Sequence, residues 1–383
     1  MTSGTTSDPV DLDTATAAPP LPVAVDAWRV ALDDAWADER GLHGTGARAR
    51  LVLGQVRSAL AELVGDPGAL VGLPPDHVRA LHAAVLGCSA PTAAADGPVV
   101  VSAVEHSAVH HAARFSGQVR EVAVDRDGRV DLDALADALP GARLACVQQA
   151  NQEIGTLQDL EAVHALCRRE GVPLLVDAGA SLGHVPVPGA WDVLVGSPRA
   201  WGSVPGAALL VLRPGVRWRR SGPGEAGASQ RPGEHPGTVD VPAALAAAVS
   251  LQSLQAGPLG DADPRHALVA RLRERVAEVP GTDVVGSAGH RLPHVLTVSA
   301  LYVPGEELVR RLDAVGFRVG SGSACTADTL RPSHVLAAVG ALTHGNVRVA
   351  VPRGTDPAVL DRFAPALAEV VAELRRELGA ESL

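Results

Sequence analysis

One cysteine lies in a segment whose composition favours an accessible, reactive thiol. Cys325 belongs to the run GSGSACT (Gly320–Thr326), which has two glycines, three hydroxyl residues and no apolar periodicity. The thiolate is the nucleophilic form of cysteine, and the guanidinium groups of Arg331 and Arg348 would lower its pKa. A lone cysteine is also often a small buried hydrophobe, and that interpretation stays open. The polar segment favours the accessible thiol and predicts that Cys325 reacts before the other cysteines.

Asp177 and His106 are two further polar residues, and each lies at the end of a predicted strand or helix. Asp177 ends the apolar segment PLLVD, and ligands of α/β proteins bind at the carboxyl ends of strands. Asp177 would also be suited to cap the turn after a buried strand. His106 directly precedes a helical segment that begins at Ser107, so a polar helix cap is one interpretation of it.

The chain contains no lysine, because all 33 residues counted as Lys or Arg are arginine. No side-chain amine is therefore present for Schiff-base chemistry or for a P-loop. Of the four cysteines, Cys88, Cys146 and Cys167 lie in or beside apolar patterns and are expected to be structural. Four scattered cysteines predict neither a disulfide framework nor a zinc site, and no other metal site is expected.

The length and the net charge limit the classes of protein to which the chain can belong. The 383 residues allow two domains, and with 46% hydrophobic but only 2% aromatic residues the core must consist mainly of Ala, Val and Leu. The net charge of −10 argues against nucleic acid or an anionic membrane as a partner. The first twenty residues lack the apolar core of a secretion signal, and no apolar run is long enough to span a membrane. A cytoplasmic protein is predicted.

Short apolar runs alternate with helical stretches through the first two thirds of the chain. Such alternation predicts an α/β fold with a mostly parallel sheet covered by helices on both faces. The strand candidates are Pro98–Ala103, Val119–Val124, Arg143–Gln149, Pro173–Asp177, Trp191–Gly196 and Ala207–Leu212.

The pattern in the last third of the chain predicts smaller units of strand, helix and strand. We expect a flexible arm over residues 1–21 that joins the small domain, a large α/β domain over 22–256 and a small α+β domain over 257–383. A long Gly/Pro/Ser-rich loop, Pro214–Pro236, interrupts the large domain.

Four segments in this order resemble the cysteine desulfurases, which have the class V aminotransferase fold and use pyridoxal phosphate (PLP). The resemblance extends from about Asp11 to Asp361. The segments are EHSAV (Glu105–Val109), ANQEIGTLQDL (Ala150–Leu160), LLVDAGASLGHVPV (Leu174–Val187) and GSGSACTADTLRPSHVLAAVG (Gly320–Gly340).

The resemblance implies a role for each of five residues. His106 would stack on the pyridine ring, and Asp177 would pair with its nitrogen. Thr238 would reach the phosphate of the neighbouring subunit's cofactor, which implies a homodimer. Arg348 would bind the substrate carboxylate. Cys325 would be the nucleophile that becomes a persulfide.

Several positions depart from the family pattern. The Schiff-base lysine is replaced by Arg199, whose guanidinium cannot form an imine, and Pro198 replaces the adjacent histidine. The Gly-Gly-Thr phosphate cradle is replaced by Pro75-Asp76-His77-Val78-Arg79. Gln152 stands at the family's asparagine, and Ala180 at the glutamine that contacts the ring oxygen. These changes predict that ordinary PLP catalysis is lost. Arg199 is either a neutral result of the arginine-rich composition or a residue of the emptied phosphate pocket that holds an anion or pairs with Asp177. If Arg199 is buried, we expect the pair with Asp177, because a buried guanidinium needs a carboxylate partner.

Three functions remain open at this stage. The leading hypothesis is a desulfurase-like protein that accepts or relays persulfide sulfur on Cys325, or that regulates an active desulfurase. The second is a catalytically silent structural or binding module, and the third is an enzyme that holds PLP without a covalent bond.

Overall fold

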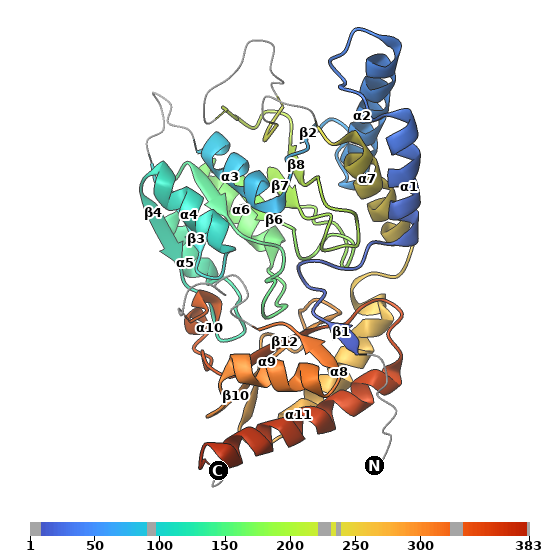
Figure 1. Ribbon diagram of the computed structural model, residues 1–383. Coiled ribbons are helices and arrows are strands. Elements are labelled where there is room, and N and C mark those ends of the chain that lie inside the picture. The colour runs from blue at the N-terminus through green and yellow to red at the C-terminus, as the bar shows by residue number, and fades with distance from the viewer. Residues whose placement is uncertain (1–8, 90–96, 221–230, 235–238, 322–331, 381–383) are drawn as a thin grey trace.

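The chain forms a seven-stranded sheet covered by helices and a smaller C-terminal layer of strands and helices (Figure 1). The structure, a computed structural model, describes residues 9–89, 97–220, 231–234, 239–321 and 332–380. The strand nearest the N-terminus lies in the C-terminal layer, so segments from both ends of the chain meet there.

The larger sheet is mostly parallel, as the alternating pattern predicts. Its strands are β2 (Leu70–Gly72), β3 (Val99–Ser102), β4 (Val119–Val122), β5 (Leu144–Cys146), β6 (Leu174–Asp177), β7 (Val193–Gly196) and β8 (Leu209–Leu212). Their order is β2-β8-β7-β6-β5-β3-β4. The five strands β7, β6, β5, β3 and β4 run parallel, and β8 pairs antiparallel with β7 and β2.

Helices cover both faces of this sheet. Two of them, α3 (His77–Cys88) and α4 (Ser107–Ser116), pack on one face. The other face is covered by α2 (Gly44–Leu63), α5 (Leu132–Ala138), α6 (Leu160–Glu170) and α7 (Val241–Gln255), with α1 (Pro22–Asp34) beside α7.

The faces of β6 decide where Asp177 points. Leu174 and Val176 belong to the core under α2, α5, α6 and α7, whereas Leu175 belongs to the core under α3 and α4. Side chains alternate along a strand, so Asp177 shares the face of Leu175. The carboxylate therefore lies on the side where α3 and α4 begin.

The C-terminal layer has its own apolar core. Its antiparallel sheet has the order β12-β10-β9, and α8 and α11 pack together against it. The elements are η1 (Gly260–Ala262), α8 (Pro264–Ala277), β9 (Thr282–Val285), β10 (Val295–Ala300), α9 (Gly305–Ala314), β11 (Phe317–Val319), α10 (His334–Ala338), β12 (Asn346–Ala350) and α11 (Pro357–Glu377).

The described part of the N-terminal arm is held in place, which differs from the flexible arm that the sequence predicts. Strand β1 (Val10–Leu12) pairs parallel with β11, and Leu12 is fully buried in the C-terminal core. Further along, the Ala18 N–H donates to the Arg199 carbonyl at 2.8 Å. A short alternating pattern, Val-Asp-Leu, is sufficient for a strand once an unpaired strand edge is available.

All six strand candidates occur, with bounds that shift by up to three residues. Strand β2 and helix α3 were not predicted, and the start of α3 had been assigned to a replaced phosphate loop. The core is rich in Ala, Val and Leu, as predicted. No helix in the described part of the chain is both long and apolar enough to cross a membrane.

Candidate functional site

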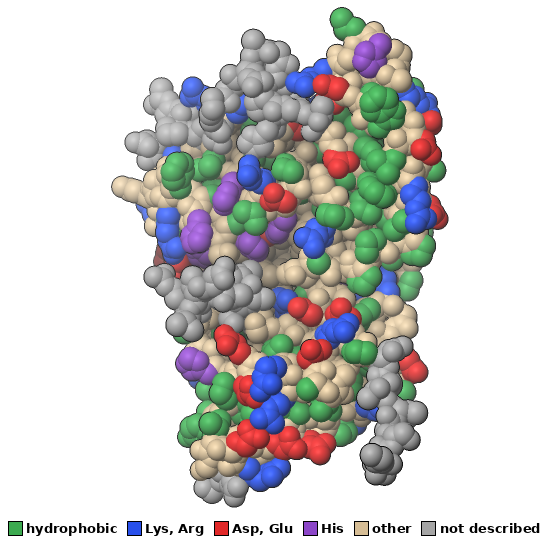
Figure 2. Space-filling model, in the orientation of Figure 1, with side chains coloured by type: hydrophobic (Ala, Val, Ile, Leu, Met, Phe, Trp, Pro, Cys, Tyr) green, Lys and Arg blue, Asp and Glu red, His purple; other side chains and the backbone are tan. Residues whose placement is uncertain are grey.

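A cavity of about 370 Å³ opens at the carboxyl ends of β6 and β7. Figure 2 shows histidine side chains gathered beside a hollow in the middle of one face. The lining comes from the N-terminal arm, the start of α3, His106 and the loops after β5, β6 and β7. The predicted site residues that line it are His106, Gln152, Asp177 and Arg199.

Asp177 is bonded to a histidine that the sequence analysis did not select. The Oδ1 atom of Asp177 lies 2.8 Å from Nε2 of His77 and accepts a second hydrogen bond from the Gly179 N–H at 2.8 Å. His77 is the first residue of α3, and Asp76 caps that helix by accepting from the Arg79 N–H. Asp76, a typical N-cap residue directly before α3, was the sequence signal that could have placed His77 at the start of a helix.

Gly179 provides the room for this pair. A Cβ atom at position 179 would lie 2.5 Å from His77 Nε2 and 2.9 Å from Asp177 Oδ1. Neither distance is tolerated between real atoms, so any larger residue would displace the imidazole.

The surroundings of His77 and Asp177 favour the charged form of each partner. Burial acts to lower the pKa of His77, but the Asp177 carboxylate and its hydrogen bond outweigh burial and raise it. Burial acts to raise the pKa of Asp177, but His77 outweighs it and holds that pKa below its ordinary value. The carboxylate that the resemblance assigns to the pyridine nitrogen therefore already has an imidazole as its partner.

His106 lines the cavity and also caps a helix. Its Nδ1 accepts a hydrogen bond from the Ala108 N–H at 3.1 Å, so the ring proton is assigned to Nε2. Burial and the neighbouring charge of His77 lower the pKa of His106 to about 4. Its ring lies edge-on to His77, with 5.4 Å between the ring centroids. The helix-cap interpretation is confirmed, and stacking on a cofactor ring stays a prediction.

The adjacent Glu105 is a second residue that the sequence analysis passed over, although it stands in the EHSAV segment. Its side chain is fully buried. One carboxyl oxygen accepts from the Gln148 N–H, and the other has no hydrogen-bond partner among the described residues. Burial and then the Asp177 charge raise the pKa of Glu105 well above its ordinary value. Burial therefore favours the protonated form of Glu105 next to the His77–Asp177 pair.

Arg348 is already engaged within the chain. Its Nη2 lies 3.0 Å from Oδ1 of Asp13 in the N-terminal arm, and its Nη1 donates to the Gln152 carbonyl at 3.3 Å. The side chain is only 3% exposed. The guanidinium that the resemblance assigns to a substrate carboxylate thus has an internal carboxylate partner.

The predicted pairing of Arg199 with Asp177 is wrong. Arg199 is exposed, and no ion pair of its side chain occurs within the described ranges. The charges that affect the pKa of Asp177 come from His77 and His106, not from Arg199. Because α3 begins directly over the end of β6, His77 takes the place expected for the guanidinium.

Two predicted site residues, Cys325 and Thr238, lie outside the described residues, as does Arg331. The other three cysteines are placed in α3, β5 and α6. Burial raises the pKa of Cys88 and of Cys167 to about 12, and that of Cys146 well above its ordinary value. These thiols remain protonated at neutral pH, in agreement with a structural role.

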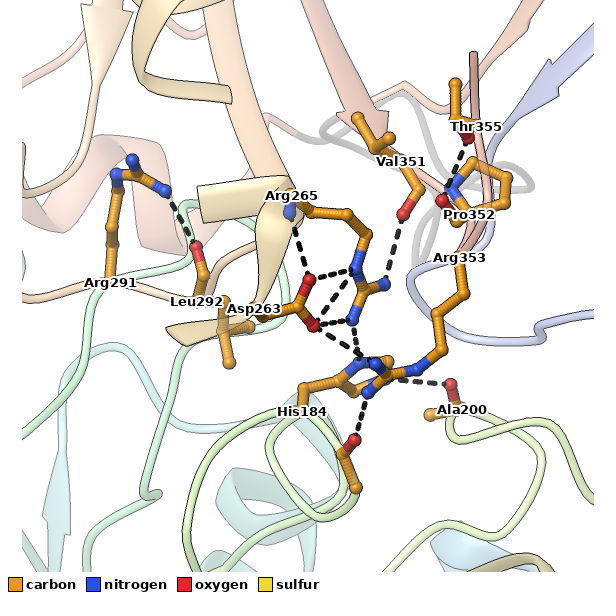
Figure 3. A network of polar contacts seen from close by, with 11 residues as sticks. His184, Ala200, Asp263, Arg265, Arg291, Leu292, Val351, Pro352, Arg353 and Thr355 are labelled. Atoms are coloured by element: carbon orange, nitrogen blue, oxygen red, sulfur yellow. Dashed lines mark hydrogen bonds and ion pairs between the residues drawn. The ribbon is translucent and has the colours of Figure 1, made fainter. Parts of the chain in front are cut away.

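A buried polar network ties the loop after β7 to the C-terminal layer (Figure 3). Arg265 can only donate, so its contact of 3.2 Å with His184 Nδ1 leaves the ring proton on Nε2, which donates to the Ala200 carbonyl at 3.1 Å. Asp263 binds Arg265 at 2.6 Å. His184 stacks on His294, and burial followed by the Arg265 charge lowers the pKa of His184 to about 3.

Comparison with known proteins defines first the class of fold. A family model described as Aminotransferase class-V matches residues 10–192. A solved structure of a NifS-like protein superposes with a TM-score of 0.83 at 21% identity, covering 96% of this chain and 100% of that one. An apo cysteine desulfurase structure from Thermococcus onnurineus NA1 gives 0.83 at 19% identity, covering 96% of this chain and 95% of that one.

Sequence relatives then identify the family. Cysteine desulfurase IscS 1 of Archaeoglobus fulgidus is 30% identical over 350 residues, which are 87% of this chain and 89% of that protein. A cysteine desulfurase of Cereibacter sphaeroides is 29% identical over 381 residues, covering 94% of this chain and 96% of that protein. The chain belongs to the cysteine desulfurase family, as its four sequence segments predict.

Proposed function

We propose that this cysteine desulfurase-family protein does not carry out Schiff-base chemistry with PLP and instead carries sulfur as a persulfide on Cys325. The bond between Asp177 and His77 is the observation that carries the first half of this proposal. A pyridine nitrogen needs a carboxylate partner to make the ring an electron sink, and here the His77 imidazole is bonded to that carboxylate.

The rest of the cavity does not fit PLP held as the family holds it. No lysine exists anywhere in the chain to form the imine, and Arg199 keeps its proton. The first turn of α3, where a phosphate would need free N–H groups, is capped by the Asp76 carboxylate. Arg348, the implied ligand of the substrate carboxylate, is bonded to Asp13.

The second half of the proposal comes from family membership and from the sequence around Cys325. The other three cysteines have raised pKa values, so they are poor nucleophiles. In the proposed step the Cys325 thiolate attacks the outer sulfur of a donor persulfide. The bond between the donor's two sulfurs breaks, the donor leaves as a thiolate, and Cys325 holds the transferred sulfur. The donor would be an active desulfurase, met within a dimer or a transient complex.

The two halves are tested separately. For the first, the full chain is incubated with PLP, reduced with borohydride and examined by mass spectrometry. We expect no pyridoxyl adduct within residues 22–255, and a stoichiometric adduct there would refute the loss of Schiff-base chemistry. PLP that binds without such an adduct would favour an enzyme that holds the cofactor noncovalently.

For the second, the chain is mixed with an active cysteine desulfurase and cysteine, and each thiol is mapped. We expect a mass gain of one sulfur on Cys325, lost in Cys325→Ser and kept in the matched control Cys88→Ser. Sulfur on another cysteine, or on none, would leave a catalytically silent binding module as the better description.

A further inference from the structure

Helix α10 is held on the loops after β3 and β5 by a small apolar cluster. Figure 1 shows the helix between the larger sheet and the C-terminal layer. Its Val335, Leu336 and Val339 are buried with Val104 and Ile154, and this cluster is separate from the larger cores. Segments with few buried apolar contacts detach before the rest of a fold unfolds. A polar group at this contact can therefore decide how often α10 detaches.

Glu153 is a buried acid at this contact. It is 7% exposed, and its Oε1 has no hydrogen-bond partner among the described residues. The carboxyl group is hydrogen-bonded to the side chain of Ser333, the residue directly before α10. The Ser333 Oγ also accepts from the Leu336 N–H at 3.2 Å, which leaves its hydroxyl proton for Glu153. The Glu153 carboxyl therefore links the loop after β5 to the first turn of α10.

The charge of Arg348 compensates only part of a carboxylate at this place. Arg348 acts on Glu153 from β12, but its Nη2 is paired with Asp13 at 3.0 Å and its Nη1 donates to the Gln152 carbonyl at 3.3 Å. Burial is the larger effect, and it raises the pKa of Glu153 to about 7 against the Ser333 hydrogen bond and the Arg348 charge.

The other titratable side chains at the contact are His334, His110 and Glu105. Nε2 of His334 lies 2.8 Å from the Glu105 carbonyl, and the Glu105 carboxyl accepts from the Gln148 N–H. The His110 ring lies edge-on to His334, with 5.3 Å between the ring centroids. Burial and then the charge of His334 lower the pKa of His110 to about 4, so this ring is neutral at pH 5.5 and above.

The proton on Glu153 affects the free energy of keeping α10 attached. A carboxyl that faces water after α10 has detached would titrate near its ordinary value of 4.5. Above about pH 7 the attached form must instead bury a carboxylate. By linkage, the attachment weakens as the pH rises from about 4.5 to about 7 and stays at that weaker level above it.

We propose that Glu153 controls the attachment of α10 through its proton: α10 stays attached while the carboxyl group is protonated and detaches more often once it is ionised. The inference goes beyond the proposed function, because it assigns a regulatory role to a buried acid outside the cavity. Because α10 follows shortly after Cys325 in the sequence, detachment would change one anchor of the segment that carries this cysteine. Only that consequence rests on the proposed function.

Hydrogen–deuterium exchange on the full chain at pH 5.5 and pH 8.5 tests the proposal. The amides of Leu336, Ala337 and Val339 are hydrogen-bonded in α10 and report its detachment. Their rates are expressed relative to the chemical exchange rate at the same pH, which removes the direct effect of pH. We expect their protection to be at least tenfold lower at pH 8.5 than at pH 5.5.

Two variants assign the effect. Glu153→Gln keeps an acceptor for the Ser333 hydroxyl but cannot ionise, so the protection of α10 should differ less than twofold between the two pH values. Glu274→Gln, at an exposed carboxylate of α8, is the matched control and should behave as the parent does.

Three results would overturn the proposal. The first is protection of α10 in the parent that does not fall with rising pH, and this result decides the matter even if Glu153→Gln fails to fold. The second is a fall that persists in Glu153→Gln, which would assign the pH effect to another group such as His334. The third is a fall that Glu274→Gln also abolishes. None of these measurements uses PLP or sulfur on Cys325, so failure here is separate from failure of the proposed function.

Discussion

At the scale of single residues, the decisive contact joins two side chains one hundred positions apart, the imidazole of His77 and the carboxylate of Asp177. Its formation explains why the arginine that replaces the Schiff-base lysine stays exposed. An exposed guanidinium keeps its hydration, whereas a buried one would need a carboxylate that His77 already occupies. Two predictions follow from this pair.

Asp177→Asn should cost about 1–3 kcal/mol of unfolding free energy near pH 5.5 and much less near pH 9. The raised pKa of His77 stabilises the fold below pH 6.5 and loses that effect as pH rises through the folded value. The lowered pKa of Asp177 stabilises the fold above pH 3.8, and this stabilisation is lost as the pH falls through the folded pKa. The titratable groups that face the pair are Asp76, His106 and Glu105.

Urea unfolding at both pH values measures this difference. Asp33→Asn, at an exposed carboxylate in α1, serves as the control. An equal cost of Asp177→Asn at the two pH values would show that the charge of His77 does not contribute.

Arg199→Lys should not restore stoichiometric PLP binding, although it places the missing amine at the family's position. Asp177 stays bonded to His77, and the first turn of α3 stays capped by Asp76. Borohydride reduction followed by peptide mapping checks this expectation. A full equivalent of pyridoxyl adduct at position 199 would mean that the lysine alone was lacking.

At the scale of elements, the start of α3 meets the end of β6 because Gly179 leaves room between them. Gly179→Ala should destabilise the fold by about 1–3 kcal/mol, since its Cβ would enter the space of the His77 ring. In a background of His77→Ala the same substitution should cost much less, because the obstructing ring is gone. Urea unfolding of the parent, the two single variants and the double variant measures the coupling between positions 77 and 179. Additive costs of the two substitutions would show that the Gly179→Ala cost does not come from contact with the His77 ring.

At the scale of the whole molecule, the network around His184 joins the cavity loops to the C-terminal layer. His184 is neutral in the fold, with a pKa of about 3, but takes up a proton in the unfolded chain below about pH 6.5. Stability therefore falls as the pH is lowered. Between pH 7 and pH 5 this histidine alone should cost about 2 kcal/mol.

His184→Gln tests this, since an amide can still donate to Ala200 and accept from Arg265. The variant should be less stable than the parent at pH 7 through the lost ring stacking on His294. The difference in unfolding free energy between the variant and the parent should shrink by about 2 kcal/mol at pH 5. His43→Gln, at an exposed helix cap, is the control. A stability difference between His184→Gln and the parent that does not depend on pH would contradict the prediction.

Much of the fold could be predicted from local sequence. The alternation of apolar runs and helical stretches predicts the six strands from β3 to β8, because periodicity reflects which face of each element is buried. The complete lack of lysine is a property of the sequence alone, and it excludes an imine whatever the fold. The short motifs were also sufficient to identify the family.

Only the tertiary structure decided which side chain meets which. Asp177 was predicted to bind Arg199 and binds His77; Arg348 was assigned a substrate and binds Asp13, 335 residues away. Such contacts depend on how a helix start, a strand end and a chain terminus approach within a few ångströms. Periodicity reports the face on which a residue lies, but the partner across that face is set by packing of distant segments, down to the missing Cβ of Gly179.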